Sequence, residues 1–142
     1  MKKLLAIILS VVTCFACLSL VSSCGNNSKF VGTYEMVSIT GTMTYNGQTT
    51  QLDESLYEYY RITLNKDGTA LVESKGNNTT SKIENEGTWE YKNNKVRLKS
   101  TQAGITVVEE MDWEDGVITY VANQSGQGME ISMNLVLEKV EE

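Results

Sequence analysis

The stretch EEMDWED, residues 109–115, holds five carboxylates in seven residues, more than any other stretch that could do chemistry. Clustered carboxylate oxygens are the ligands that calcium prefers, and a pair of carboxyl groups is what glycoside cleavage requires. Alternation along a strand, however, places Glu110, Asp112 and Glu114 in one row, where they do not converge on an ion. The pattern therefore predicts a solvated outer face beside a hairpin, with no metal, no cofactor and no catalytic residue.

Composition removes several other kinds of site. The chain has no histidine, which excludes histidine bases, histidine zinc ligands and Ser-His or Cys-His nucleophile pairs. Its formal net charge is −6, so phosphates repel it and nucleic acid is not an expected partner. These absences predict a binding or structural protein and not an enzyme.

The amino terminus has the pattern of a secretory signal peptide, two lysines followed by a long apolar run. Val21-Ser22-Ser23-Cys24 resembles the bacterial lipobox, in which an aliphatic residue and two small residues precede a cysteine. The resemblance implies a signal peptide over residues 1–23, diacylglycerol on Cys24, and an acyl chain such as palmitate on the new amino group. Residues 24–29 would then be the lipidated cysteine and a short linker. The alternative is an uncleaved membrane-anchored helix with an incidental cysteine.

Lipidation at Cys24 has consequences for location and shape. The mature chain would carry a formal charge of −8, because the leader removes two lysines and no acid. It would keep no second thiol, so it could form no disulfide. The linker at residues 25–29 reaches about 17 Å at most. We expect a monomer in the bacterial cell envelope, anchored on the outer side of the cytoplasmic membrane or in the outer membrane facing the periplasm.

Turn signals recur along the rest of the chain, at Asn46-Gly47, Asp67-Gly68, Asn93-Asn94 and Asp115-Gly116. Such dipeptides favour tight hairpins, and the intervals between them each fit two strands. The pattern predicts an all-β, antiparallel up-and-down meander of eight or nine strands over residues 30–142. Asp53 is expected to cap at most one short helix, with a tyrosine-rich loop as the alternative. Looser connections are expected at residues 53–60, 75–85, 101–104 and 123–128.

Apolar alternation predicts the register of three hairpins. The expected pairs are Leu64 with Ala70, Ile62 with Val72, Trp89 with Leu98, Tyr91 with Val96, Glu90 with Arg97, Trp113 with Ile118, and Met111 with Tyr120. Each hairpin gains one apolar face that must be buried. Closure into a barrel buries these faces and removes free edges, and a two-sheet sandwich is the alternative.

Three short motifs resemble those of lipocalins. Gly32-Thr33-Tyr34 is similar to the Gly-x-Trp signature, with tyrosine in place of tryptophan. Lys66-Asp67-Gly68-Thr69 and Gly87-Thr88-Trp89-Glu90 resemble the DGT and GTW pattern of small bacterial lipocalin-like lipoproteins. The resemblance implies a lipocalin-like β-barrel with a possible central cavity. Lipocalins carry a late basic residue that packs on the tryptophan, and Lys139 is the residue available for that place.

An aromatic and methionine set shares the interior phase: Tyr34, Met36, Trp89, Tyr91, Met111, Trp113, Tyr120 and Met133. These side chains could line a ligand cavity, or they could fill the barrel as solid core. Glu109 has the same phase, opposite Ala122, and Gln124 is the nearest amide that could join it. We expect Glu109 either at the barrel end in water or, with Gln124, at the mouth of a cavity.

The expected function is binding of a small apolar or amphipathic ligand near the membrane. Glu109 and the net charge repel carboxylates, so neutral lipids and amphipathic amines are the expected cargo. One alternative is a protein-binding module, including an inhibitor of an envelope enzyme. Ser125-Gly126-Gln127-Gly128 faintly resembles the Ser-Gly-x-Gly loop of small periplasmic lysozyme inhibitors. A structural component without a ligand is a third alternative.

Overall fold

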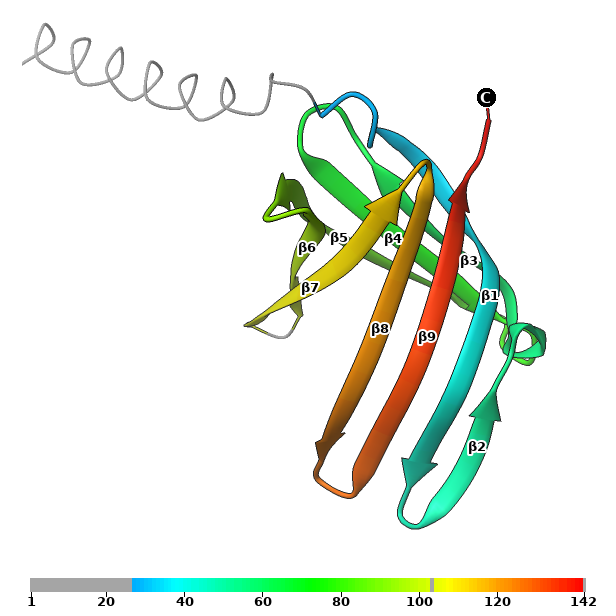
Figure 1. The fold of residues 1–142 in the computed structure, drawn as a ribbon. Helices are drawn as coiled ribbons and strands as arrows, with labels where there is room; N and C mark the ends of the chain where they lie inside the picture. The colour runs from blue at the N-terminus through cyan, green and yellow to red at the C-terminus, as the bar shows by residue number, and fades with distance from the viewer. Residues whose placement is uncertain (1–26, 103, 142) are drawn as a thin grey trace, which may run out of the picture.

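Nine antiparallel strands and one 3-10 turn make up residues 27–102 and 104–141, the part of the chain that the computed structural model describes (Figure 1). The elements are β1 (Gly32–Tyr45), β2 (Gln48–Leu52), η1 (Glu54–Leu56), β3 (Tyr57–Leu64), β4 (Thr69–Gly76), β5 (Lys82–Lys92), β6 (Lys95–Gln102), β7 (Ile105–Glu114), β8 (Val117–Gly126) and β9 (Met129–Lys139). The predicted signal peptide and Cys24 lie outside the described residues. Within those residues, no helix is long and apolar enough to cross a membrane.

The strands form a closed barrel because the first strand pairs with the last. Strand order is β2-β1-β3-β4-β5-β6-β7-β8-β9, with an additional pairing between β1 and β9. Residues 32–35 of β1 pair with β3, whereas residues 41–45 pair with the extra strand β2. Eight strands therefore close the barrel and the ninth extends one hairpin. The predicted antiparallel meander is confirmed, and closure excludes the sandwich.

The predicted hairpin turns are confirmed by backbone angles. Asn93 and Asn94 both have positive φ, at 54° and 62°, as a two-residue hairpin of this type requires. One turn was missed. Gln127 and Gly128 have φ of 51° and 78° and form a tight turn, where the prediction had a loose connection over residues 123–128. The prediction was wrong because Asn123–Gly126 is polar, and a polar strand cannot be told from a loop by composition.

The tyrosine-rich segment after Asp53 forms a strand and not a loop. The Asp53 carboxylate accepts a hydrogen bond from the Ser55 backbone N–H at 2.9 Å, so the predicted cap is confirmed. The helical turn ends at Leu56, and β3 begins at Tyr57. The other loose connections also shrink, since β4 extends to Gly76, β5 begins at Lys82, β6 runs to Gln102 and β7 begins at Ile105.

Six of the seven predicted residue pairs are confirmed: Leu64 with Ala70, Ile62 with Val72, Trp89 with Leu98, Tyr91 with Val96, Glu90 with Arg97, and Trp113 with Ile118. The pairing of Met111 with Tyr120 is wrong. β7 pairs with β8 only over Asp112–Glu114 and then separates from it. Each strand has a much longer ladder on its other side, β7 with β6 and β8 with β9. The short ladder between β7 and β8 ends where the twist of the two long ladders turns these strands away from each other.

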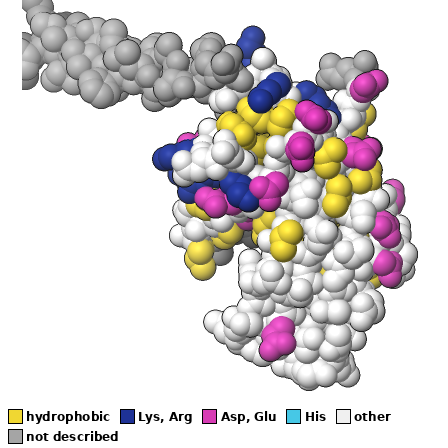
Figure 2. All heavy atoms as spheres, viewed as in Figure 1, with side chains coloured by type: hydrophobic (Ala, Val, Ile, Leu, Met, Phe, Trp, Pro, Cys, Tyr) yellow, Lys and Arg dark blue, Asp and Glu magenta, His cyan; other side chains and the backbone are white. Residues whose placement is uncertain are grey.

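The core occupies the end of the barrel at which the chain enters. Its buried apolar side chains are Phe30, Tyr34, Ile39, Ile62, Leu64, Ala70, Trp89, Val96, Leu98, Met111, Ile118, Leu135 and Leu137. Toward the other end, interior side chains become half-buried and then exposed. The projecting halves of β1, β2, β8 and β9 carry almost no charged side chains on the face that Figure 2 shows.

Candidate functional site

One end of the barrel is closed by Phe30, which lies in the turn before β1. Its side chain is 1% exposed, and its ring stacks on Tyr91 with a centroid distance of 4.2 Å. The rings of Trp113 and Trp89 meet it edge-on at 4.7 Å and 6.3 Å. Aromatic pairs in these geometries add packing energy beyond that of their buried area. Three of the predicted ligand-lining residues thus pack around Phe30, and the chain's own side chains fill this end.

Hydrogen bonds hold the closed end in place. The Tyr34 hydroxyl donates to the Phe30 carbonyl oxygen at 2.7 Å and accepts from the Trp113 indole N–H at 3.1 Å. Burial raises the pKa of Tyr34, while the bond from Trp113 acts in the opposite direction. The Trp89 indole N–H donates to the Asn65 carbonyl oxygen at 2.8 Å. Each buried polar atom of these rings therefore has a partner, which stabilises one packing of this end.

Lys139 packs across Gly32, beside Tyr34. Lys139 pairs with Tyr34 across β9 and β1, and its ammonium donates to the Lys29 carbonyl oxygen at 3.2 Å. A Cβ on Gly32 would lie 2.6 Å from Lys139 Cε, and Gly32 has φ of 144°. The glycine of the Gly-x-Tyr motif thus makes room for the late basic residue that the lipocalin resemblance implies.

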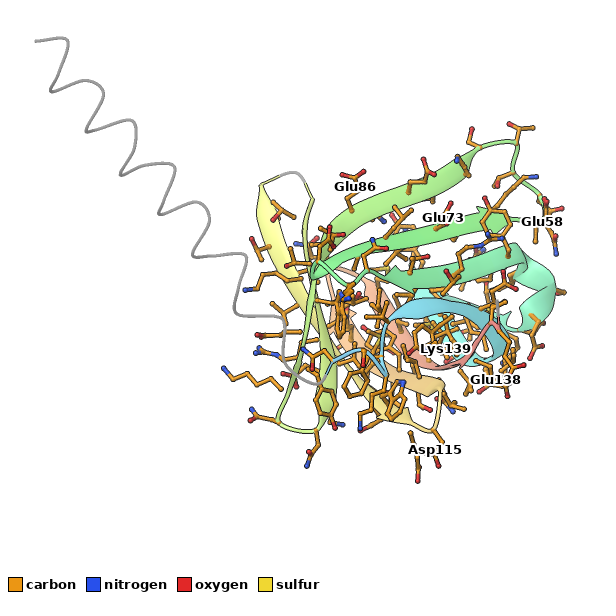
Figure 3. The ribbon with its side chains drawn as sticks, turned by 90° about the horizontal axis from the view of Figure 1, so that it is seen from above. Glu58, Glu73, Glu86, Asp115, Glu138 and Lys139 are labelled. Atoms are coloured by element: carbon orange, nitrogen blue, oxygen red, sulfur yellow. The ribbon has the colours of Figure 1, made fainter. Side chains whose placement is uncertain are left out.

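A hollow of about 940 Å³ lies on the outer side of the wall beside Gly32 and Lys139. Arg61 and Glu35 line it as an ion pair, with nitrogen and oxygen 3.6 Å apart. Figure 3 shows Lys139 at the end of β9, one of the strands that line the hollow. Because side chains of both charges line it, this surface offers no selective site for either sign.

Toward the opposite end of the barrel, which we call the open half, the interior side chains are only half-buried. Tyr57, Tyr60, Tyr120 and Met133 are half-buried against the core. The rings of Tyr57 and Tyr60 meet edge-on with centroids 6.0 Å apart. Here aromatic and methionine side chains are neither fully packed nor fully exposed, as in the wall of a ligand site.

Glu109 brings a carboxylate into this half-buried region. The Tyr120 hydroxyl donates to Glu109 Oε1 at 3.2 Å. Burial, followed by the charge of Glu109 and this hydrogen bond, raises the pKa of Tyr120 to about 12. Burial also raises the pKa of Tyr60, helped by the charge of Glu109 and by Tyr57 and Tyr120. Three phenols and one carboxylate therefore share one electrostatic environment.

The remaining predicted site residues fall into different places. Met111 is buried in the core at 2% exposure, and Met36 is half-buried against it. Met133 lies in the open half, next to Ala122 across β8 and β9. Gln124 is exposed on β8, so the polar partner that the structure gives Glu109 is Tyr120 and not the amide.

β7 and β8 separate beyond Asp112 and Thr119 (Figure 1). A slot lies between the two strands there. This shallow slot has a volume of about 430 Å³ and is lined by Arg97, Val108, Glu109, Glu110 and residues 120–124. Glu109 and Tyr120 form its inner edge, because both have the interior phase of their strands. The slot thus reaches from the outer face of β7, at Glu110, to the interior phase, at Glu109.

The carboxylate row on β7 lies on the outer face, as predicted. Glu110 and Asp112 are exposed and pair with basic residues of β6, Arg97 at 2.9 Å and Lys95 at 2.6 Å. Arg97 also reaches Glu90 on β5 at 3.0 Å. Within residues 27–102 and 104–141, no three carboxylates or thiols come together in a way that could hold a metal ion.

A family model described as a lipocalin-like domain matches residues 30–128. The chain belongs to this family. No curated protein and no solved structure matches the chain significantly. The match begins at Phe30, the residue that closes the barrel. Lipocalin-like domains are generally non-enzymatic binding proteins, and their barrel is a ligand-binding fold.

Sequence reasoning missed three residues of this lipocalin-like domain. Phe30 stands alone before the first strand, so no periodic pattern marks it as core. Tyr57 and Tyr60 belong to the run YEYY, which the prediction placed in a helix or loop. That run has the aromatic richness of a strand, and this signal could have placed the two tyrosines in the interior.

Proposed function

We propose that this protein is a lipid-anchored lipocalin-like protein of the bacterial cell envelope, which binds a small amphipathic ligand in the open half of its barrel. One observation carries the binding proposal: the hydrogen-bonded pair of Glu109 and Tyr120 lies among half-buried aromatic side chains in the barrel interior. A carboxylate in a region of that kind gives a ligand's polar end a partner, and the rings around it suit an apolar body.

Exposed apolar side chains with the interior phase, near the rim of the barrel, support a binding site at its mouth. Ile83 is 59% exposed and Val107 is 41% exposed, although both follow the phase of buried residues on their strands, Trp89 and Met111. Apolar side chains that face inward but remain wet gain stability when a ligand covers them. We therefore expect the apolar body of the ligand to contact Ile83 and Val107.

The anchor is supported by the lipobox-like sequence that ends at Cys24. Only Gly25 and Asn26 separate that cysteine from the described residues, which begin with the turn that carries Phe30. A lipid on Cys24 would hold the closed end toward the bilayer, since two residues span only about 7 Å. The open half would then face away from the membrane surface.

Native mass spectrometry of the barrel with an envelope lipid extract tests the binding proposal. The buried core lies between Phe30 and Leu137, so a fragment that begins at Asn26 keeps all of its packing. A retained small molecule, displaced together with a change in tryptophan fluorescence, is the expected result. A bare barrel at every lipid concentration would contradict it. Glu114→Gln, on the outer face of β7 and outside the slot, is the matched control for Glu109→Gln.

A second candidate is the protein-binding module, and one observation favours it. Residues 120–126 of β8 pair only with β9 in the described part of the chain, and they carry no charge. An uncharged free edge can accept a strand from another protein. Slower amide hydrogen exchange at residues 120–126 on addition of envelope proteins, in a barrel that retains no lipid, would favour this candidate.

A further inference from the structure

Glu109 differs from Glu110 and Asp112, its acidic neighbours on β7, in having no cationic partner. Within the described residues, no lysine or arginine lies within ion-pairing distance of its carboxylate. The nearest cation in the slot, Arg97, is held between Glu90 at 3.0 Å and Glu110 at 2.9 Å. Since Arg97 is already shared by two carboxylates, the charge of Glu109 remains uncompensated, and the slot as a whole is negative.

The position of Glu109 also differs. Figure 3 shows Glu58, Glu73 and Glu86 on the outer side of their strands. Glu109 instead follows the interior phase of Met111 and is half-buried. A carboxylate that loses part of its hydration without gaining a cation costs free energy, and a cationic ligand would recover it.

The side chains around Glu109 have the chemistry that recognises an alkylated cation. Tyr120 holds the carboxylate from the facing edge of the slot at 3.2 Å. Tyr60 is half-buried, meets Tyr57 edge-on at 6.0 Å, and experiences the charge of Glu109. Aromatic rings attract substituted ammonium groups through their electron-rich faces, and alkyl groups on nitrogen lower the cost of removing the ion from water.

From this geometry we infer that the slot between β7 and β8 binds a substituted ammonium group, held by Glu109 together with Tyr120 and Tyr60. The inference rests on the proposed function and names the polar end of the ligand. The group enters through the side of the barrel. The ligand's apolar body then lies inward, against Ala122 and Met133 of the open half. Anionic amphiphiles are repelled by Glu109.

Three soluble probes, used below their micellar concentrations, test the inference by isothermal titration calorimetry on the fragment beginning at Asn26. Dodecyltrimethylammonium carries the cation and an apolar chain. Dodecyl maltoside carries the same chain on an uncharged head group, and tetramethylammonium carries the cation without the chain. We expect the first probe to bind about tenfold more tightly than the second, the size of effect that a desolvated cation–aromatic contact gives. Tetramethylammonium separates two possible sources of the ammonium group. A site for a small free amine would bind it as tightly as the first probe, whereas a site for a lipid head group would bind it more weakly, because the apolar chain is missing.

Two isosteric variants assign the effect to the slot. Glu109→Gln removes the charge without changing the shape, so the preference for the cationic probe over the uncharged one should fall to about twofold or less. Tyr120→Phe keeps the ring and removes the hydroxyl, so part of the preference should remain. Glu114→Gln, which lies on the outer face of β7 and does not line the slot, should keep the full preference. Circular dichroism establishes that each variant is folded.

The outcomes separate this inference from the proposed function. Equal binding of the cationic and uncharged probes would overturn the ammonium site and leave a ligand-binding barrel. A cationic preference that survives in Glu109→Gln would also overturn it, since the slot would not be its source. Binding of none of the three probes, together with no retained lipid in the native mass spectra, would remove both proposals.

Discussion

The Tyr120 hydroxyl lies 3.2 Å from the Glu109 carboxylate, although the strands that carry the two residues no longer pair at that point. The bond therefore crosses an opening in the barrel wall and is not part of a ladder between adjacent strands. Its effect on Tyr120 is measurable, because a nearby negative charge and burial both disfavour the phenolate.

Alkaline titration is the first prediction. The pKa of Tyr120 is raised from 10.0 to about 12, so the folded protein keeps a proton that the unfolded chain loses near pH 10. The unfolded state thus binds fewer protons, and the free energy of unfolding falls as pH rises from about 10 to 12. Urea unfolding at several pH values measures this slope. Tyr120→Phe should make the slope shallower, and an unchanged slope would contradict the assignment.

The closed end supplies the second prediction. Phe30→Ala should lower the free energy of unfolding by about 3–5 kcal/mol, because it removes a buried ring that contacts three other aromatic side chains. Ile83→Ala is the control, since Ile83 is 59% exposed and should change stability by less than about 1 kcal/mol. Urea denaturation of both variants makes the comparison. Equal losses would mean that Phe30 does not close the barrel.

The closed end shows what a single sequence could predict. Trp89 opposite Leu98 followed from alternation and turn chemistry, because a hairpin with the wrong phase would expose a whole apolar face. Phe30 did not follow, since a residue outside the strands has no periodicity and joins the core only through tertiary packing. Residues within strands could thus be placed by their alternation, whereas Phe30 could not.

The candidate site shows the same limit more sharply. Alternation placed Glu109 on the interior phase correctly but paired its strand with β8 as though the hairpin continued. Whether two strands stay together depends on the twist of the ladders on either side, which is a property of the whole barrel. The slot and the bond from Tyr120 both arise from that separation, so neither could be predicted from the hairpin sequence.

A glycine in β1 supplies the third prediction. A Cβ on Gly41 would overlap the carbonyl oxygen of Ser132 on β9 and would lie 2.9 Å from Met133 Cα, and Gly41 has φ of 136°. Backbone cannot move aside as a flexible side chain can, so Gly41→Ala should cost more than about 3 kcal/mol. Gly126→Ala is the control, because nothing lies within 4 Å of its Cβ position. Thermal unfolding of the two variants should differ strongly, and similar midpoints would mean that β1 and β9 do not approach this closely.

The fourth prediction concerns the proposed anchor. Cys24→Ser should abolish incorporation of a labelled fatty acid, because the thiol is the atom that would carry diacylglycerol and the chain's other two cysteines lie within the proposed leader. The variant should also keep its leader, since cleavage is expected only after lipid is attached, and that leader could still hold the protein at a membrane. Membrane fractionation alone would therefore not discriminate. The measurement is metabolic labelling with mass determination, and Cys17→Ser is the control that should label normally. Fatty acid retained on the Cys24→Ser protein would contradict the lipoprotein proposal, whereas loss of the label in both variants would point to a general failure of export.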